Sequence, residues 1–121
     1  MRLQATVLNA TDARRLAHFY AALLDWPLDT DETDWVTLRD PAGGAALSFQ
    51  TEPLYRRPVW PAAEGAQQMM MHLDIAVADL PGAVDRAVSL GATLAEFQPQ
   101  ADVRVCLDPD GHPFCLFRAG A

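Results

Sequence analysis

Apolar residues recur at helical spacing in two stretches of the chain. From Ala13 to Leu24, apolar side chains return every three or four residues, which is typical of one face of an amphipathic helix. A second such stretch follows Asp79 and stops at Gly91, a usual residue at the C-terminal end of a helix. Asp12 and Asp79 precede the two stretches, and aspartate caps helices by accepting hydrogen bonds from their first backbone N–H groups. The pattern therefore predicts two capped helices.

Shorter apolar runs, bounded by turn-forming residues, predict strands on either side of each helix. They cover residues 4–10, 35–38 and 45–50 in the first half, and residues 71–77, 93–97, 103–107 and 114–118 in the second. Asp40-Pro-Ala-Gly43 and Asp108-Pro-Asp-Gly111 separate the last two strands of each half. Proline suits the second position of a tight turn and glycine tolerates unusual backbone angles, so each half is predicted to end in a hairpin.

The two halves of the chain repeat one another. Asp79 follows Asp12 by 67 positions and Asp108 follows Asp40 by 68, so the helix caps and the turns keep nearly the same spacing. An internal repeat of this kind indicates duplicated supersecondary units, each of which buries an apolar face. We predict a single α+β domain over residues 1–121, with a first βαβββ unit (1–50), a connector (51–68) and a second βαβββ unit (69–119).

Composition narrows the expected partners and location. The formal net charge is −7, from 16 acidic residues against nine arginines and no lysine. Nucleic acids and anionic membranes select basic surfaces, so neither is an expected partner, and a cationic small molecule is mildly favoured. No apolar run approaches the ~20 residues of a membrane span, and the N-terminus lacks the apolar core of a signal peptide. We therefore expect a cytoplasmic protein in which Cys106 and Cys115 are reduced thiols.

Two segments of the second half resemble a known family. They are His72-Leu-Asp-Ile-Ala-Val-Ala-Asp79 and Asp108-Pro-Asp-Gly-His-Pro-Phe-Cys-Leu116. With the paired βαβββ units, they are similar to the vicinal oxygen chelate superfamily, which includes glyoxalase I, extradiol dioxygenases and bleomycin-binding proteins, and above all to small glyoxalase-like domains of bacteria. The resemblance implies a glyoxalase-like fold, in which a curved mixed sheet surrounds a cavity for a small molecule, and it implies a homodimer.

The resemblance also implies four metal-ligand positions, on the first and last strand of each unit. In this sequence those positions hold Ala5, Leu47, His72 and Cys115. Alanine and leucine cannot bind a metal, and cysteine replaces the family's usual glutamate, so we expect no metal and no other cofactor. An alternative stays open, in which His72 and Cys115 bind a divalent metal together with Asp74 and with Cys106, which we place opposite Cys115 across the hairpin.

His72 and Asp74 are the candidate catalytic residues, because they share one strand face and a carboxylate can orient an imidazole for proton transfer. The alternative is a histidine that only packs at the cavity wall. Alternation along the strands predicts an apolar wall with few polar groups, as in most small-molecule sites. The predicted ligand-binding residues are His72, Asp74, Cys115, Phe117, Phe49, Leu47, Val7 and Asn9, with Trp35 and Trp60 at the rim. At the same rim, Arg56 or Arg57 would meet an anionic group, whereas His112 is expected to be structural.

Two functional hypotheses follow from these residues. The first is a metal-free binding protein that sequesters a toxic or antibiotic compound, as the bleomycin-binding relatives do. The second is a lyase, isomerase or dioxygenase that uses His72, either with a displaced metal site or as an acid–base catalyst with Asp74. A nucleophilic pair of His72 and Cys115 is disfavoured, because no motif supplies an oxyanion site.

Overall fold

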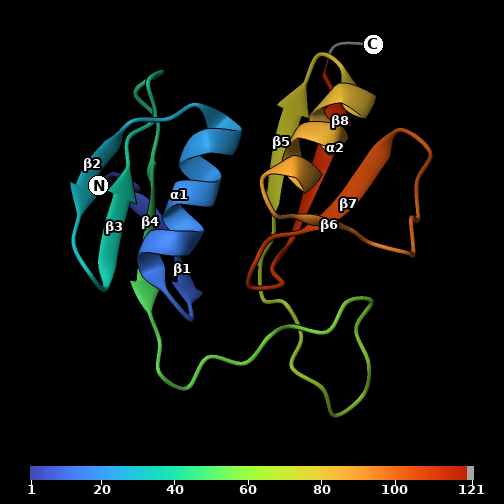
Figure 1. Cartoon of the computed structure of the whole chain (residues 1–121), viewed down its shortest axis with the longest axis horizontal. Helices are drawn as coiled ribbons and strands as arrows, with labels where there is room; N and C mark the ends of the chain where they lie inside the picture. The colour runs from blue at the N-terminus through green and yellow to red at the C-terminus, as the bar shows by residue number, and fades with distance from the viewer. Residues whose placement is uncertain (120–121) are drawn as a thin grey trace. The chain divides into compact units, whose positions relative to one another are not determined.

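The computed structural model of the chain describes residues 1–119, which form two compact units, residues 1–55 and the residues from Arg56 onward. Each unit holds one helix and one four-stranded sheet (Figure 1). Among the described residues, no helix is long and apolar enough to cross a membrane. The fold is therefore α+β with two βαβββ units, as the sequence repeat predicts.

The first unit contains strand β1 (Ala5–Ala10), helix α1 (Ala13–Leu24) and strands β2 (Leu28–Asp31), β3 (Trp35–Leu38) and β4 (Ala46–Thr51). Its strands lie in the order β1-β4-β3-β2. Strand β1 pairs with β4 in parallel, while the β4–β3 and β3–β2 pairs are antiparallel, so the sheet is mixed. The sequence pattern missed β2, because three of its four residues are exposed and it lies at the sheet edge.

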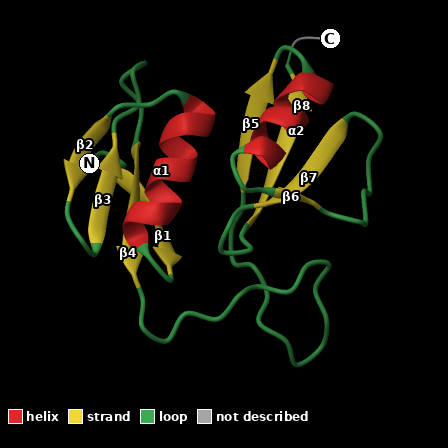
Figure 2. Ribbon diagram, in the orientation of Figure 1, coloured by secondary structure: helices red, strands yellow, loops and turns green. Residues whose placement is uncertain are grey.

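The second unit repeats this arrangement. It contains β5 (Leu73–Val77), α2 (Leu80–Ser89), β6 (Thr93–Leu94), β7 (Val103–Leu107) and β8 (Pro113–Arg118). Its strands lie in the order β5-β8-β7-β6, with β5 parallel to β8 and the other pairs antiparallel. In both units the helix lies against the sheet and covers one of its faces (Figure 2).

Equivalent aspartates in the two halves form the same local structures. Asp12 caps α1 by accepting hydrogen bonds from two backbone N–H groups, and Asp79 caps α2 by accepting one. In the turns before β4 and β8, the carboxylates of Asp40 and Asp108 each accept hydrogen bonds from the backbone N–H groups two and four residues later. These local bonds explain why caps and turns can be read from the sequence.

The apolar core of each unit lies between its helix and the covered sheet face. In the first unit, Tyr20 of α1 stacks on Phe49 of β4 with ring centroids 5.6 Å apart, and both side chains are fully buried. In the second unit, Phe114 and Leu116 of β8 are buried, together with Cys106 of β7. Because side chains alternate along a strand, the residues between these core positions lie on the opposite face of each sheet, called the open face here because the unit's own helix does not cover it.

Candidate functional site

The strand register corrects one of the four positions that the family resemblance assigned. Asp74 of β5 pairs with Cys115 of β8, and the matching pair in the first unit is Val7 of β1 with Ser48 of β4. The position equivalent to Cys115 is therefore Ser48 and not Leu47. The difference arises because the first unit has one more residue between the aspartate of its turn and this position than the second unit has.

Leu47 and Phe49 consequently lie on the face opposite to the one we predicted. Phe49 packs on α1, and Leu47, two residues earlier on the strand, shares its face and is only 5% exposed. Their assignment to an open cavity wall is therefore wrong, because both belong to the core of the first unit. Ser48 lies on the other face, where its hydroxyl is 3.0 Å from that of Thr37 in a hydrogen bond.

The other predicted residues of the first unit do lie on its open face. Val7, Asn9 and Trp35 are exposed, and the sheet register places them beside Ser48 and Gln50. The Nε2 of Gln50 donates a hydrogen bond of 2.7 Å to Oδ1 of Asn9. Their part in ligand binding stays a prediction.

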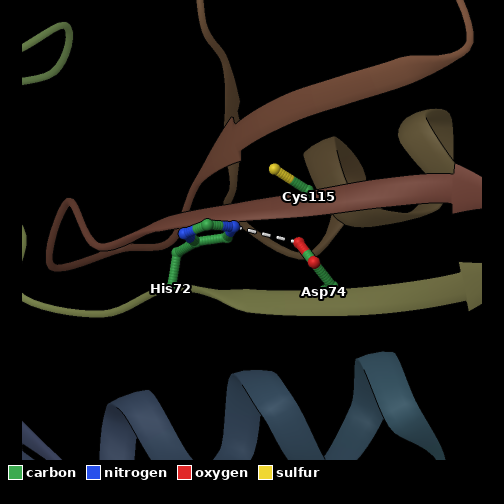
Figure 3. A group of neighbouring side chains, drawn as sticks. All are labelled: His72, Asp74 and Cys115. Atoms are coloured by element: carbon green, nitrogen blue, oxygen red, sulfur yellow. Dashed lines mark ion pairs between the residues drawn. The ribbon is translucent and has the colours of Figure 1, made fainter.

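Three polar residues of the second unit meet on its open sheet face. His72 immediately precedes β5, Asp74 lies two residues further along that strand, and Cys115 is the register partner of Asp74 on β8. Figure 3 shows His72 and Asp74 directed toward each other, with Nε2 of His72 3.0 Å from Oδ1 of Asp74, and Cys115 on the neighbouring strand. One nitrogen, one oxygen and one sulfur atom of the trio all lie within 4.8 Å of one another. The side chains of His72 and Asp74 are 38% and 62% exposed, so the trio is reachable from solvent.

Cys115 is the least exposed member of the trio. Burial raises the pKa of its thiol, and the negative charge of Asp74 and a hydrogen bond between the two side chains raise it further. A cysteine nucleophile needs a thiolate and therefore a lowered pKa. The environment of Cys115 favours the protonated thiol, which argues against a Cys115–His72 nucleophilic pair.

Cys106 does not join this trio. It pairs with Phe114, whereas Cys115 pairs with Val105, so the predicted pairing of the two cysteines is wrong by one residue. Cys106 is fully buried on the helix-covered side, and this burial, with a smaller contribution from the charge of Cys115, raises its pKa to about 11. It therefore behaves as a small buried hydrophobe, and both cysteines are free thiols.

A pocket of about 210 Å³ opens beside the trio, entirely within the second unit. Two of the trio, His72 and Cys115, are part of its wall. The remaining wall residues are mostly apolar: Trp60, Met69, Pro99, Gln100, Val103, Val105 and Pro113. Three of these nine lining residues, His72, Cys115 and Trp60, were predicted, and their part in ligand binding stays a prediction. Phe117, which pairs with Val103, lies on the same sheet face.

Two segments without regular structure contribute to the wall, beside residues of β7 and β8. The loop before β7 contributes Pro99 and Gln100, and Gln98 fastens this loop to β7. The Gln98 side chain accepts a hydrogen bond of 2.9 Å from the N–H of Val105 and donates one of 3.0 Å to its carbonyl. Trp60 comes from the connector and packs against Phe97, with ring centroids 5.7 Å apart. No periodic pattern marks such loops, so the sequence offered only the aromatic character of Trp60 as a signal.

Arg57, which was weighed as an anion-binding residue, has a structural role, and so has His112. The Arg57 side chain lies over Gly111, and its Nη1 donates a hydrogen bond of 3.1 Å to the carbonyl of Pro109. Nδ1 of His112 lies 2.8 Å from Oδ2 of the buried Asp108, which confirms the expected structural role of His112. Arg57 thus braces the second turn and is not placed as an anion-binding group at the pocket.

The family's four-ligand metal centre does not fit this chain. With the corrected register its positions hold Ala5, Ser48, His72 and Cys115. A methyl group and a hydroxyl already bonded to Thr37 stand where the first unit would supply two ligands. Divalent metals need several charged or imidazole donors, so these four positions do not form that centre.

Comparison with known proteins places this geometry in a family. A family model described as a glyoxalase-like domain matches residues 5–117. No curated protein sequence matches the chain. Among solved structures, a glyoxalase/bleomycin resistance protein/dioxygenase family enzyme from Burkholderia phytofirmans PsJN is similar with a TM-score of 0.75 and 16% identity, covering 99% of this chain and all of that one.

Two further structures agree with this likeness. A glyoxalase-related enzyme from Fulvimarina pelagi has a TM-score of 0.70 at 17% identity, covering 98% of this chain and 88% of that one. A possible glyoxalase from Bacillus cereus has a TM-score of 0.67 at 14% identity, covering 97% and 98%. At such identities the structures support the fold, while the family model covers nearly the whole sequence. The chain therefore belongs to the family of glyoxalase-like domains, within the vicinal oxygen chelate superfamily.

Proposed function

We propose that this protein binds a small, mainly apolar molecule in the pocket of its second unit, without the metal centre of its metal-dependent relatives. The observation that carries the proposal is the pocket itself, with an aromatic and aliphatic wall and the His72–Asp74 pair at one side. Ligand sites commonly combine a hydrophobic wall with a few polar groups that fix orientation. Sequestration of a toxic or antibiotic compound is the role we propose for such binding.

Size and charge narrow the proposed ligand. The pocket volume of about 210 Å³ lies below the ~300–1,000 Å³ of most ligand pockets, which suits a compact molecule or one ring of a larger one. Asp74 places a carboxylate beside the two trio members that line the pocket, and the whole chain carries a net charge of −7. A cationic or hydrogen-bond-donating group beside an apolar ring is therefore the chemistry that we expect to be bound.

Thermal unfolding with three ring compounds of matched size tests the proposal. Benzylamine, benzyl alcohol and benzoate differ mainly in charge, and binding to the folded state raises its stability by ~2.7 kcal/mol at a ligand concentration of 100 Kd. We expect the largest rise in Tm with benzylamine and the smallest with benzoate, and no change in this order when EDTA is present. Equal shifts for all three compounds would contradict the role of Asp74.

A pair of tryptophan variants tests the location of binding. Trp60→Ala removes part of the pocket wall, so we expect it to abolish most of the Tm shift caused by benzylamine. Trp26→Ala removes an indole of the first unit and serves as the matched control, which should keep the shift. A shift that survives Trp60→Ala would place the ligand elsewhere.

One observation favours a second function, an acid–base enzyme. A carboxylate 3.0 Å from an imidazole nitrogen fixes the ring and its tautomer, as in many catalytic histidines. If a substrate is found, His72→Gln should lower kcat while Asp74→Asn lowers it less, because Asp74 acts through His72. Unchanged kcat in His72→Gln would reject the enzymatic reading and leave the binding proposal standing.

A further inference from the structure

The geometry points to a metal site that belongs to the second unit alone: His72, Asp74 and Cys115 form a three-donor site for a thiophilic divalent cation such as Zn²⁺. This site is distinct from the four-ligand centre of the family. His72 and Cys115 stand at two of the family's four positions, but the third donor, Asp74, does not, and the first unit supplies no donor. The site shares His72 and Cys115 with the wall of the proposed ligand pocket, and Asp74 with its expected charge preference, whereas the proposed ligand binding requires no metal.

The three donors share one sheet face for reasons of strand geometry. Asp74 and Cys115 are register partners on the adjacent strands β5 and β8, and His72 precedes Asp74 by two residues. Residues two apart on a strand point to the same side, so backbone register brings all three side chains together. Two of the three donors therefore lie on paired strands, and the third immediately precedes one of these strands.

The distances fit a single small cation after modest side-chain rotation. Nε2 of His72 lies 3.0 Å from Oδ1 of Asp74, and the three donor atoms lie within 4.8 Å of one another. Zinc binds nitrogen, oxygen and sulfur at about 2.0–2.3 Å, so neighbouring donors of a tetrahedral ion are ~3.4 Å apart. Figure 3 shows the imidazole facing the carboxylate, with the sulfur of Cys115 on the neighbouring strand.

The donor types select the class of metal. Magnesium and calcium prefer oxygen ligands, whereas thiolate and imidazole favour zinc, cobalt and similar transition metals. Because the thiol binds as a thiolate, metal binding displaces the proton of Cys115 that Asp74 now accepts in a hydrogen bond. Three protein ligands leave a coordination position for water or for a donor atom in the pocket, which His72 and Cys115 line.

The repeat supplies an internal comparison. The first-unit positions that match His72, Asp74 and Cys115 hold Ala5, Val7 and Ser48. A methyl group, an isopropyl group and a hydroxyl cannot replace the three donors. The proposal therefore requires one strong site per chain, not one per unit.

Titration of EDTA-treated, dialysed protein with Co²⁺ tests the site directly. We expect one Co²⁺ per chain, with a near-ultraviolet charge-transfer band that reports a cobalt–thiolate bond and that Zn²⁺ removes by displacement. Excess Mg²⁺ should leave the band unchanged. Saturation without a thiolate band, or loss of the band in excess Mg²⁺, would overturn the proposal.

Variants decide which residues bind the metal. Cys115→Ser should abolish the thiolate band, and Asp74→Asn and His72→Ala should each weaken Co²⁺ binding by at least about tenfold. His18→Ala is the matched control, because His18 also faces an aspartate, with Nε2 3.6 Å from Oδ2 of Asp31 in the first unit. It should bind Co²⁺ as the unaltered protein does.

Two outcomes would count against the assignment of these residues. One is a band that persists in Cys115→Ser and is lost in Cys106→Ser, with both variants shown to be folded by circular dichroism. The other is equal weakening by His18→Ala and His72→Ala. Benzylamine binding in EDTA is measured separately, so failure of the metal site and failure of the proposed function are distinguishable.

Discussion

The two repeated turns test how burial changes the contribution of equivalent hydrogen bonds to the free energy of unfolding. The carboxylate of Asp108 is fully buried and accepts hydrogen bonds from the N–H groups of Asp110 and His112 at 2.9 and 3.0 Å. The carboxylate of Asp40, which is partly exposed, accepts the equivalent bonds from Ala42 and Gly44 at 2.8 and 3.1 Å. Truncation of each aspartate to alanine removes the same backbone bonds from two different environments.

The expected losses differ because water can replace only one of the two carboxylates. A buried donor left without a partner costs about 1–3 kcal/mol, whereas an intramolecular hydrogen bond that water can replace contributes about 0.5–1.5 kcal/mol. Asp108→Ala removes the acceptor of the buried Asp110 N–H, of the partly buried His112 N–H, and of Nδ1 of His112, which lies 2.8 Å from Oδ2. We therefore expect Asp108→Ala to cost about 4 kcal/mol and Asp40→Ala about 1–2 kcal/mol of unfolding free energy.

Urea unfolding followed by circular dichroism measures both losses. Asp108→Asn serves as an intermediate variant, because its amide oxygen keeps one acceptor in the buried site. The expected order of stability is the unaltered chain, then Asp40→Ala, then Asp108→Asn, then Asp108→Ala. Equal losses for the two alanine variants, within about 0.5 kcal/mol, would refute the reasoning that burial sets the cost.

Two further predictions concern thiol reactivity and the core. Because burial and Asp74 raise the pKa of Cys115, its alkylation by iodoacetamide should be slow at neutral pH and accelerate only as the pH approaches the raised pKa. The reaction should be faster in Asp74→Asn, and mass spectrometry of labelled peptides measures its rate. An unchanged rate in Asp74→Asn would contradict this prediction. Cys106 should stay unlabelled unless the protein unfolds. Phe49→Ala should destabilise by about 3–5 kcal/mol in urea unfolding, whereas Trp35→Ala, on the exposed face, should cost less than about 1 kcal/mol; similar losses would contradict the observed sheet faces.

Local sequence signals made the fold predictable, whereas the site was harder to predict because it depends on strand register. Helix caps and turns depend on contacts within a few residues, so the roles of Asp12 and Asp79 followed from the sequence. Strand register depends on loop length, and one additional residue before β4 moved the equivalence from Leu47 to Ser48. Since side chains alternate along a strand, this shift of one position exchanged the core face for the open face.

The candidate site was predictable where spacing alone decided it. His72 immediately precedes β5 and lies two residues before Asp74, so the extended spacing expected from the sequence predicted their meeting. The exclusion of Cys106 required the observed hairpin register, which differs by one residue from the expected one. The wall residues Pro99 and Gln100 come from a loop whose path depends on tertiary hydrogen bonds of Gln98, and such bonds leave no periodic signal in the sequence.

The unequal halves of the repeat also make the chain a scaffold for design. The register that pairs Val7 with Ser48 is the one that pairs Asp74 with Cys115, and Ala5 precedes Val7 by the spacing that separates His72 from Asp74. Ala5→His, Val7→Asp and Ser48→Cys would thus install a copy of the trio on a sheet that already has the required geometry. Each half would then carry the same chemistry, and a comparison of the two copies would separate what the side chains do from what their surroundings add.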